Sequence, residues 1–179
     1  MRYLKAKIKS TLQKEFVKGF LILFSGSSIA QAIPLLATIV LARLFSNDSF
    51  GILFLYSTTV VLLSILATLK YELAIVLPKN EIEAINILIL SLLVCVLVSC
   101  AILTVVLLFS DQITLLLKNE GIRRWLKFVP VSVFFTGTLQ ATNNWFLWQK
   151  KFKNISISNI TKSSGTAATQ LAFGIGKLT

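Results

Sequence analysis

Long apolar blocks, separated by short polar segments, dominate the hydrophobic pattern of the chain. A helix needs about 20 apolar residues to cross a bilayer core, because inside lipid each backbone donor and acceptor must be satisfied within its own segment. Four blocks reach this length, and a fifth extends to the end of the sequence. The pattern predicts membrane-spanning helices over residues 19–42, 51–69, 84–109, 127–148 and 155–178. Because the spacers are short, we expect neighbouring helices to run antiparallel and to pack together.

The composition agrees with a membrane protein. Of the 179 residues, 55% are hydrophobic and 14% are charged, whereas a soluble domain carries about a quarter charged residues. The fold class that we predict is all-α, a polytopic bundle of about five transmembrane helices. The chain has no histidine, and Cys95 and Cys100 lie within one apolar block. These features argue against a disulfide framework, a zinc site and most hydrolytic chemistry, so we expect no enzyme activity, no cofactor and no metal.

The charges are distributed as a topology signal and not as a nucleic-acid surface. The formal net charge is +11, but the Lys and Arg residues lie between the apolar blocks, so we expect no nucleic acid as a partner. Residues 1–18 hold six of them against one acidic residue, Glu15. We interpret this segment as a basic cytoplasmic tail, followed by a membrane domain over residues 19–179. Positive charges next to spans stay in the cytoplasm, so the tail places the N-terminus inside.

Polar side chains recur at helical spacing in several predicted spans, which places them on one face of each helix. Gln31 and Pro34 in the first span are unsuited to face lipid, since the proline leaves the carbonyl of Ala30 without its helical partner. The stripes predict helices that line a common interior, with Gln31 and Asn143 both facing water. The cavity candidates are Gln31, Pro34, Thr38, Gln140, Asn143, Asn144 and Gln170.

An alternative is that these polar residues only hold helices together, because small residues permit close approach and amides hydrogen-bond across helices. We favour this packing role for Ser91, Cys95 and Ser99 in the third span. For the amides of Gln31 and Asn143 both roles remain open. No Asp or Glu lies deep inside a predicted span, so the carboxylate typical of a proton or sodium relay is missing there.

Basic and aromatic residues at the ends of the spans are candidates for contact with lipid headgroups. Asn80 followed by Glu83 predicts the N-cap of the third span, so the segment before it forms an elbow at the inner surface. Cations at such a surface attract phosphate, although simple interfacial anchoring is the alternative, as for Trp145 and Trp148. The interface candidates are Arg43, Lys70, Tyr71, Lys150 and Lys151.

Three segments resemble a known family. The linker between the first two predicted spans reads Leu-Ala-Arg-Leu-Phe-Ser-Asn-Asp-Ser-Phe-Gly over residues 41–51. It is similar to the Leu-x-Arg-x-Leu-Gly-x-x-x-Phe-Gly linker of the polysaccharide exporter and O-antigen flippase family, except that Phe45 and Ser46 stand where Leu-Gly is usual. The segment at residues 70–78 resembles the basic-Tyr-Glu stretch before the third span of that family. Residues 143–145, 149–153 and 155–158 resemble its junction between spans four and five.

This resemblance places the chain in the multidrug/oligosaccharidyl-lipid/polysaccharide exporter superfamily and implies a function. The chain would belong to a flippase of lipopolysaccharide biosynthesis. The flippase would move an undecaprenyl-diphosphate-linked O-antigen or related repeat unit to the periplasmic leaflet of the bacterial inner membrane. The implied partners are this lipid-linked oligosaccharide, membrane lipids, the polysaccharide polymerase and the chain-length machinery. Family members have about 12 to 14 spans in two lobes around a central cavity, so we expect this chain to be an N-terminal fragment with an incomplete first lobe.

Three alternatives stay open at this stage. A different exporter of the same superfamily, of the multidrug or teichoic-acid type, would have the same spans. If the chain is complete, the alternative is a small membrane subunit that transports nothing. A membrane-embedded transferase would need carboxylates at the surface, and Glu72, Glu81 and Glu83 form a cluster without an acid/base or metal-binding pattern.

Overall fold

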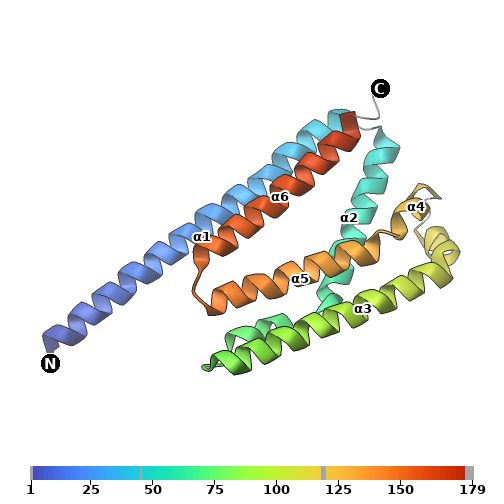
Figure 1. Cartoon of the computed structure of the whole chain (residues 1–179). Coiled ribbons are helices and arrows are strands. Elements are labelled where there is room, and N and C mark those ends of the chain that lie inside the picture. The colour runs from blue at the N-terminus through green and yellow to red at the C-terminus, as the bar shows by residue number, and fades with distance from the viewer. Residues whose placement is uncertain (1, 45, 118–119, 176–179) are drawn as a thin grey trace. The chain divides into compact units, whose positions relative to one another are not determined.

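The computed structural model describes residues 2–44, 46–117 and 120–175, and this part of the chain is helical without any strand (Figure 1). Long apolar blocks form helices because only a helix satisfies every backbone group within one segment. The α-helices are α1 (Arg2–Leu44), α2 (Asn47–Ala67), α3 (Glu81–Leu116), α4 (Arg123–Leu126), α5 (Val129–Trp148) and α6 (Phe152–Ile175). Two 3-10 helices, η1 (Tyr71–Val76) and η2 (Glu120–Ile122), lie in the connections.

Three helices in the described residues are long and apolar enough to cross a membrane: Val17–Arg43 within α1, Asp48–Ala67 within α2, and α3. They overlap the first three predicted spans, and their length and composition indicate a multi-pass membrane protein. The fourth and fifth predicted spans are also helices, α5 and α6. Their crossing of the membrane stays a prediction, and residues 176–178 of the fifth span lie outside the described part.

The helices extend beyond several of the predicted span boundaries. The predicted basic tail is helical and forms the first part of α1, which begins at Arg2. The third span was expected to end at residue 109, but α3 continues to Leu116 after a break at Phe109, where φ is −119° and ψ is 21°. The apolar block ends at this break, and the polar turn that follows lies in the predicted spacer. The rest of this spacer holds η2 and α4, and the spacer over residues 70–83 holds η1.

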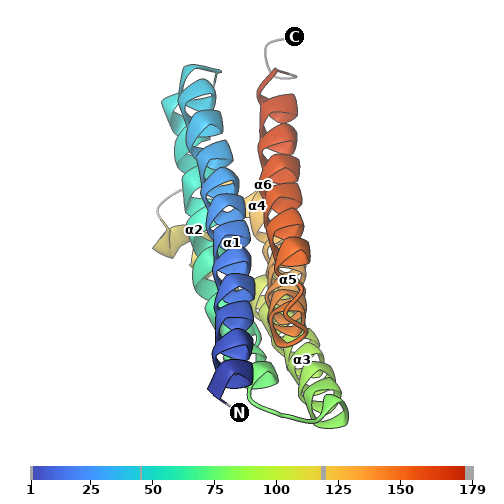
Figure 2. The same ribbon diagram turned by 90° about the vertical axis from the view of Figure 1, so that its left-hand side faces the viewer.

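The chain divides into two compact units, of which the first consists of α1 and α6. These helices run side by side and parallel (Figures 1 and 2). Glycines make the close contact possible: a Cβ on Gly19 would lie 2.5 Å from the ring of Phe152, and one on Gly26 would lie 2.3 Å from Ser156 Cβ. The Ser156 hydroxyl donates a hydrogen bond of 2.9 Å to the carbonyl of Ile22. Small residues and a polar bond across the interface are typical of helix pairs in membranes.

The second unit runs from α2 to α5 and has its own core, to which α2, α3 and α5 contribute equally and η2 and α4 add one residue each. Within this unit α3 and α5 are antiparallel (Figure 1), as expected for spans joined by a short connection. Cys95 Sγ lies 3.6 Å from the carbonyl of Phe134, and Trp148 Nε1 donates a hydrogen bond of 2.9 Å to the carbonyl of Pro78. The buried core residues are Val60, Ala67, Cys95, Val106, Ile122, Leu126, Val129 and Val133.

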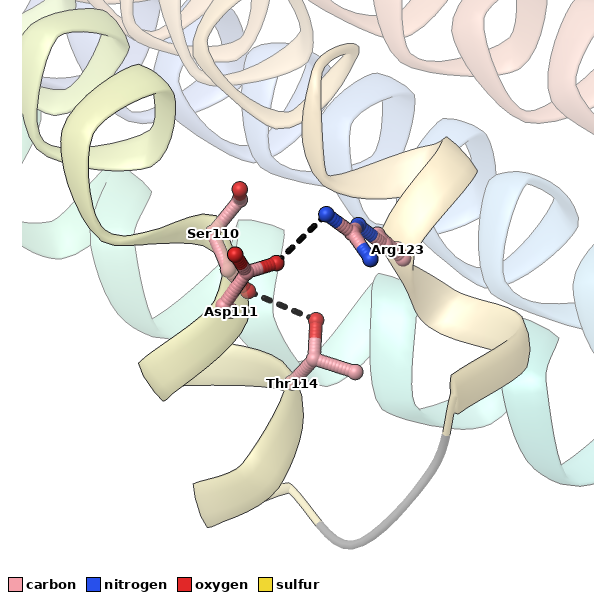
Figure 3. Close-up of polar contacts among 4 residues, drawn as sticks. All are labelled: Ser110, Asp111, Thr114 and Arg123. Atoms are coloured by element: carbon pink, nitrogen blue, oxygen red, sulfur yellow. Dashed lines mark hydrogen bonds and ion pairs between the residues drawn. The ribbon is translucent and has the colours of Figure 1, made fainter.

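An exposed ion pair joins α4 to the end of α3. Arg123 Nη2 lies 2.6 Å from Asp111 Oδ1, and both side chains are more than half exposed (Figure 3). One turn further on, Thr114 donates a hydrogen bond of 2.7 Å to the carbonyl of Ser110, just after the break at Phe109. The ion pair joins the last turns of α3 to α4, whereas the Thr114 hydrogen bond is internal to α3.

Candidate functional site

The amides predicted on the fourth span lie on α5, within the second unit. Gln140, Asn143 and Asn144 are all half-buried. Asn144 Nδ2 donates a hydrogen bond of 3.0 Å to the backbone carbonyl of Gln140. In the described part of the chain Gln140 Oε1 is buried and accepts no hydrogen bond. A buried amide oxygen that lacks a donor is costly, so Gln140 is a position at which a hydroxyl group of a ligand or a water molecule would be stabilised.

The polar residues of the first predicted span lie beside, and not on, the face of α1 that packs against α6. That face consists of small or apolar residues such as Ala30 and Ala37, which are buried. Gln31, Pro34 and Thr38 are exposed, and the Thr38 hydroxyl donates a hydrogen bond of 2.7 Å to the carbonyl of Pro34. The position leaves this stripe available for contacts other than α6. Whether it lines water stays a prediction.

Gln170 belongs to the same unit, on α6, and its side chain is half-buried. The cavity candidates are thus divided between the two units: Gln31, Pro34, Thr38 and Gln170 belong to the first, and Gln140, Asn143 and Asn144 to the second.

The interface candidates lie at helix ends and in connections, as expected. Lys70 and Tyr71 are exposed at the start of η1, where Lys70 adopts a left-handed conformation with φ of 63°. Lys150 and Lys151 are exposed between α5 and α6, and Lys150 also has a positive φ, of 57°. Arg43 is exposed in the last turn of α1. Exposed cations at such positions can pair with a phosphate group without a large desolvation cost.

The predicted elbow contains a carboxylate whose burial the sequence did not predict. Glu72 in η1 is only 3% exposed, and Thr68, at the end of α2, is fully buried. The Thr68 hydroxyl donates a hydrogen bond to the Glu72 carboxylate. Their spacing of four residues, followed by the apolar run at residues 73–77, is the signal in the sequence that points to this burial. Asn80 is the N-cap of α3 as predicted, and its side chain donates to Glu83 Oε1 over 3.0 Å.

The face of α3 that carries Ser91, Cys95 and Ser99 is buried. This agrees with the packing role that we favoured for these small residues. Gly137 of α5 lies directly against it, since a Cβ there would be 2.6 Å from Cys95 Sγ and 3.4 Å from Thr68 Cγ2. The end of α2, the middle of α3 and the middle of α5 therefore meet at one point.

An apolar groove of about 380 Å³ lies in the second unit and exposes only apolar atoms. Leu63 of α2 lines one side and Ile102 and Val106 of α3 line another, with Leu126 and Val129 at its end. Such a lining suits hydrocarbon and excludes the groove as a sugar site, because sugar hydroxyls would lack hydrogen-bond partners there.

Comparison with known proteins places this arrangement in a family. No curated protein sequence and no solved structure matches the chain. The family model described as polysaccharide biosynthesis protein matches residues 16–177, which include all three apolar helices and all of the cavity candidates. The chain belongs to this polysaccharide biosynthesis family.

Proposed function

We propose that the chain acts as part of a flippase for a lipid-linked oligosaccharide, with an undecaprenyl-diphosphate-linked O-antigen or related repeat unit as its substrate. The observation that carries the proposal is the buried, unpartnered amide oxygen of Gln140 in a membrane protein of a polysaccharide biosynthesis family. Sugar hydroxyls donate hydrogen bonds, and side-chain amides are suitable partners for them. Neither acid/base chemistry nor a cofactor is needed to move such a substrate.

The three parts of the substrate have different requirements. The glycan needs polar partners, which the amides of α1 and α5 supply. The diphosphate needs cations, and the exposed Lys70, Lys150 and Lys151 are suitable. The polyprenyl tail remains in lipid throughout. In this scheme the N-terminus is cytoplasmic, the protein resides in the bacterial inner membrane, all five predicted spans cross it, and alternating access exposes the amides first to one side and then to the other.

Thiol accessibility tests whether Gln31 and Asn143 each face water. Cys95 and Cys100 are first replaced, and Gln31→Cys and Asn143→Cys are then treated in intact cells with a hydrophilic thiol reagent. We expect both to react, whereas the control Phe54→Cys, at a 65% exposed apolar position of α2, should resist because it faces lipid. Resistance of positions 31 and 143 equal to that of position 54 would count against water at these amides.

An export assay tests the role of Gln140. We expect Gln140→Leu to reduce surface polysaccharide in the cells that make the protein, at an unchanged level of the protein in the membrane. Thr136→Val is the control, since it removes a hydroxyl one turn away on the same helix. Normal export by the Gln140 variant would contradict the proposed contact between its amide and the glycan.

A further inference from the structure

A lysine lies in the middle of α6, the helix that forms most of the fifth predicted span. Lys162 is exposed, and it follows Phe152, the first residue of the helix, by ten residues. Ten residues of helix cover about 15 Å, which is about half the thickness of a bilayer core. With α6 across the membrane, as proposed above, this ammonium group faces the protein interior or a water-filled space, because a charge at that depth is strongly disfavoured in lipid.

The contacts between α1 and α6 place Lys162 at the depth of Gln31. Gly26 of α1 lies against Ser156 of α6, and the two helices run parallel (Figure 2). Gln31 follows Gly26 by five residues, and Lys162 follows Ser156 by six. The two positions therefore differ in height by about one residue of helix, or about 1.5 Å.

Both residues also lie on the same side of this helix pair. On α1, Gln31 directly follows Ala30, a buried residue of the contact face. On α6, Lys162 directly precedes Ser163, which shares the contact face with Ser156 because the two serines are seven residues, or about two turns, apart. One step forward on α1 and one step back on α6 are rotations of about 100° in opposite senses. In two parallel helices that face each other, opposite rotations lead to the same side, so Lys162 and Gln31 border one polar patch.

No carboxylate of the first unit is placed to pair with Lys162. The sequence of this unit holds one acidic residue, Glu15. Glu15 precedes Gln31 by 16 residues on α1, which corresponds to about 24 Å of helix. Among the described residues, the ion pair that the structure shows is that of Arg123 with Asp111. Because a charge at this depth needs a counter-charge, the anion that meets Lys162 comes from outside the unit.

The depth of Lys162 favours an anionic group of the glycan over the diphosphate. Lys150 and Lys151, two of the cations proposed for the diphosphate, directly precede α6. Lys162 lies about 15 Å further along the helix, and a diphosphate is too short to contact all three lysines. A substrate whose diphosphate lies at the first two lysines therefore presents a sugar to the third, next to the amide of Gln31.

We propose that Lys162 and Gln31 form an acidic-sugar site, in which the ammonium group pairs with the carboxylate of a uronic acid and the amide binds the hydroxyl groups of the same sugar. The inference rests on the proposed flippase function and narrows its substrate to repeat units that carry an acidic sugar. A hydrogen bond between an ammonium group and a carboxylate is charge-assisted and stronger than one between neutral groups. A neutral glycan would leave the ammonium group without a counter-charge.

Protection from acetylation tests the site without any export. The purified protein in detergent is treated with the N-hydroxysuccinimide ester of acetic acid, and peptide mass spectrometry measures acetylation of Lys162 and of Lys153, the internal control. The probes are digalacturonic acid, a neutral digalactose and inorganic pyrophosphate. We expect digalacturonic acid to slow the acetylation of Lys162 and not that of Lys153. Gln31→Leu should weaken this protection about fivefold, because one hydrogen bond to the sugar is lost.

Three results of this assay would overturn the proposal. Protection of Lys162 by pyrophosphate and not by digalacturonic acid would identify a phosphate site. Equal protection by digalactose would show that the charge of the sugar is irrelevant. Protection by none of the probes would mean that the counter-charge of Lys162 is supplied by protein.

The polysaccharide itself provides the second test. We expect the surface polysaccharide whose export requires this protein to contain a carboxylate sugar in each repeat unit, as measured by sugar analysis after hydrolysis. Lys162→Gln should reduce its export about tenfold, the value of one charge-assisted hydrogen bond, and Lys162→Arg should retain most of it. Thr166→Val is the control, since Thr166 lies one turn away on the same side of α6 and its hydroxyl bonds the carbonyl of Lys162 over 2.8 Å.

The outcomes separate this inference from the proposed function. A neutral repeat unit, or normal export by Lys162→Gln, would overturn the acidic-sugar site and leave the flippase function standing. Polysaccharide export that does not require the protein would overturn the flippase function, and the protection assay would still decide whether Lys162 binds an acidic sugar.

Discussion

The backbone of Gly26 in α1 lies against Ser156 in α6, close enough that a Cβ on the glycine would be 2.3 Å from the serine Cβ. The Ser156 hydroxyl bonds the carbonyl of Ile22 one turn earlier, over 2.9 Å. Helix pairs in membranes are stabilised by dispersion contacts at close approach. Hydrophobic burial contributes little, because lipid is as apolar as the side chains. The α1–α6 pair therefore depends on the absence of a side chain at residue 26.

We expect Gly26→Ala to lower the thermal stability of the chain by about 1–3 kcal/mol, because the added methyl group forces the helices apart. Gly165→Ala is the matched control, since a Cβ there meets nothing within 4 Å and helix propensity favours alanine by about 1 kcal/mol. Thermal unfolding in detergent measures both. Adding Ser156→Gly should restore part of the loss, whereas adding Ser156→Ala should not. A Gly26→Ala variant as stable as the control would refute the contact.

Helix positions could be predicted well from the sequence, because a membrane span requires about 20 consecutive apolar residues. This property can be recognised without knowing which residues contact one another in the fold. The predicted start of the third span near Asn80 agrees with the N-cap in the structure. The helix continues beyond the predicted end of the span at residue 109, because Phe109 breaks the helix geometry without ending the helix. Hydropathy detects the end of an apolar block, and a polar helix that continues beyond it carries no such signal.

The candidate site was predictable only in part. Helical periodicity showed which residues share a face, so the buried face at Ser91 and Ser99 could be anticipated. Periodicity does not show which neighbour that face meets. The burial of Glu72 was not predicted, because it depends on the left-handed conformations of Leu69 and Lys70. Glycine would indicate such conformations, and leucine and lysine do not.

Trp148 anchors the end of α5 to the elbow through its hydrogen bond to the carbonyl of Pro78. We expect Trp148→Phe to reduce stability by about 1 kcal/mol, because the ring is kept and the donor is lost. Trp145 stacks on Trp148 with ring centroids 5.2 Å apart. Trp145→Phe, which keeps a stacked ring, is the control and should have a smaller effect in the same unfolding assay. An equal loss for both variants would show that ring packing, and not the hydrogen bond, holds this end of α5.

The ion pair between Arg123 and Asp111 is short, at 2.6 Å, but both side chains are mostly exposed. Solvent screening limits such pairs, so we expect Asp111→Asn to cost less than about 1 kcal/mol. The loss should shrink in high salt, where screening is stronger. Unfolding at low and high NaCl measures this difference, and the charge-swapped double variant, Asp111→Arg with Arg123→Asp, should recover most of the low-salt loss. A loss that persists in high salt would contradict a purely electrostatic contribution.

Thr68 supplies the hydrogen bond that the structure shows at the buried carboxylate of Glu72. We expect Thr68→Val to lower stability by about 1–3 kcal/mol, because the shape is kept while a buried acceptor loses its donor. Thr59→Val is the control: the Thr59 hydroxyl bonds the carbonyl of Leu55 in its own helix over 2.8 Å, and that carbonyl also takes part in the helix.

The decisive measurement is the double variant Thr68→Val with Glu72→Gln. If the bond to the carboxylate is what Thr68 contributes, the two changes are coupled and the double variant loses less stability than the sum of the single variants. Additive losses would mean that Thr68 and Glu72 act independently, and that the buried carboxylate is stabilised by other groups.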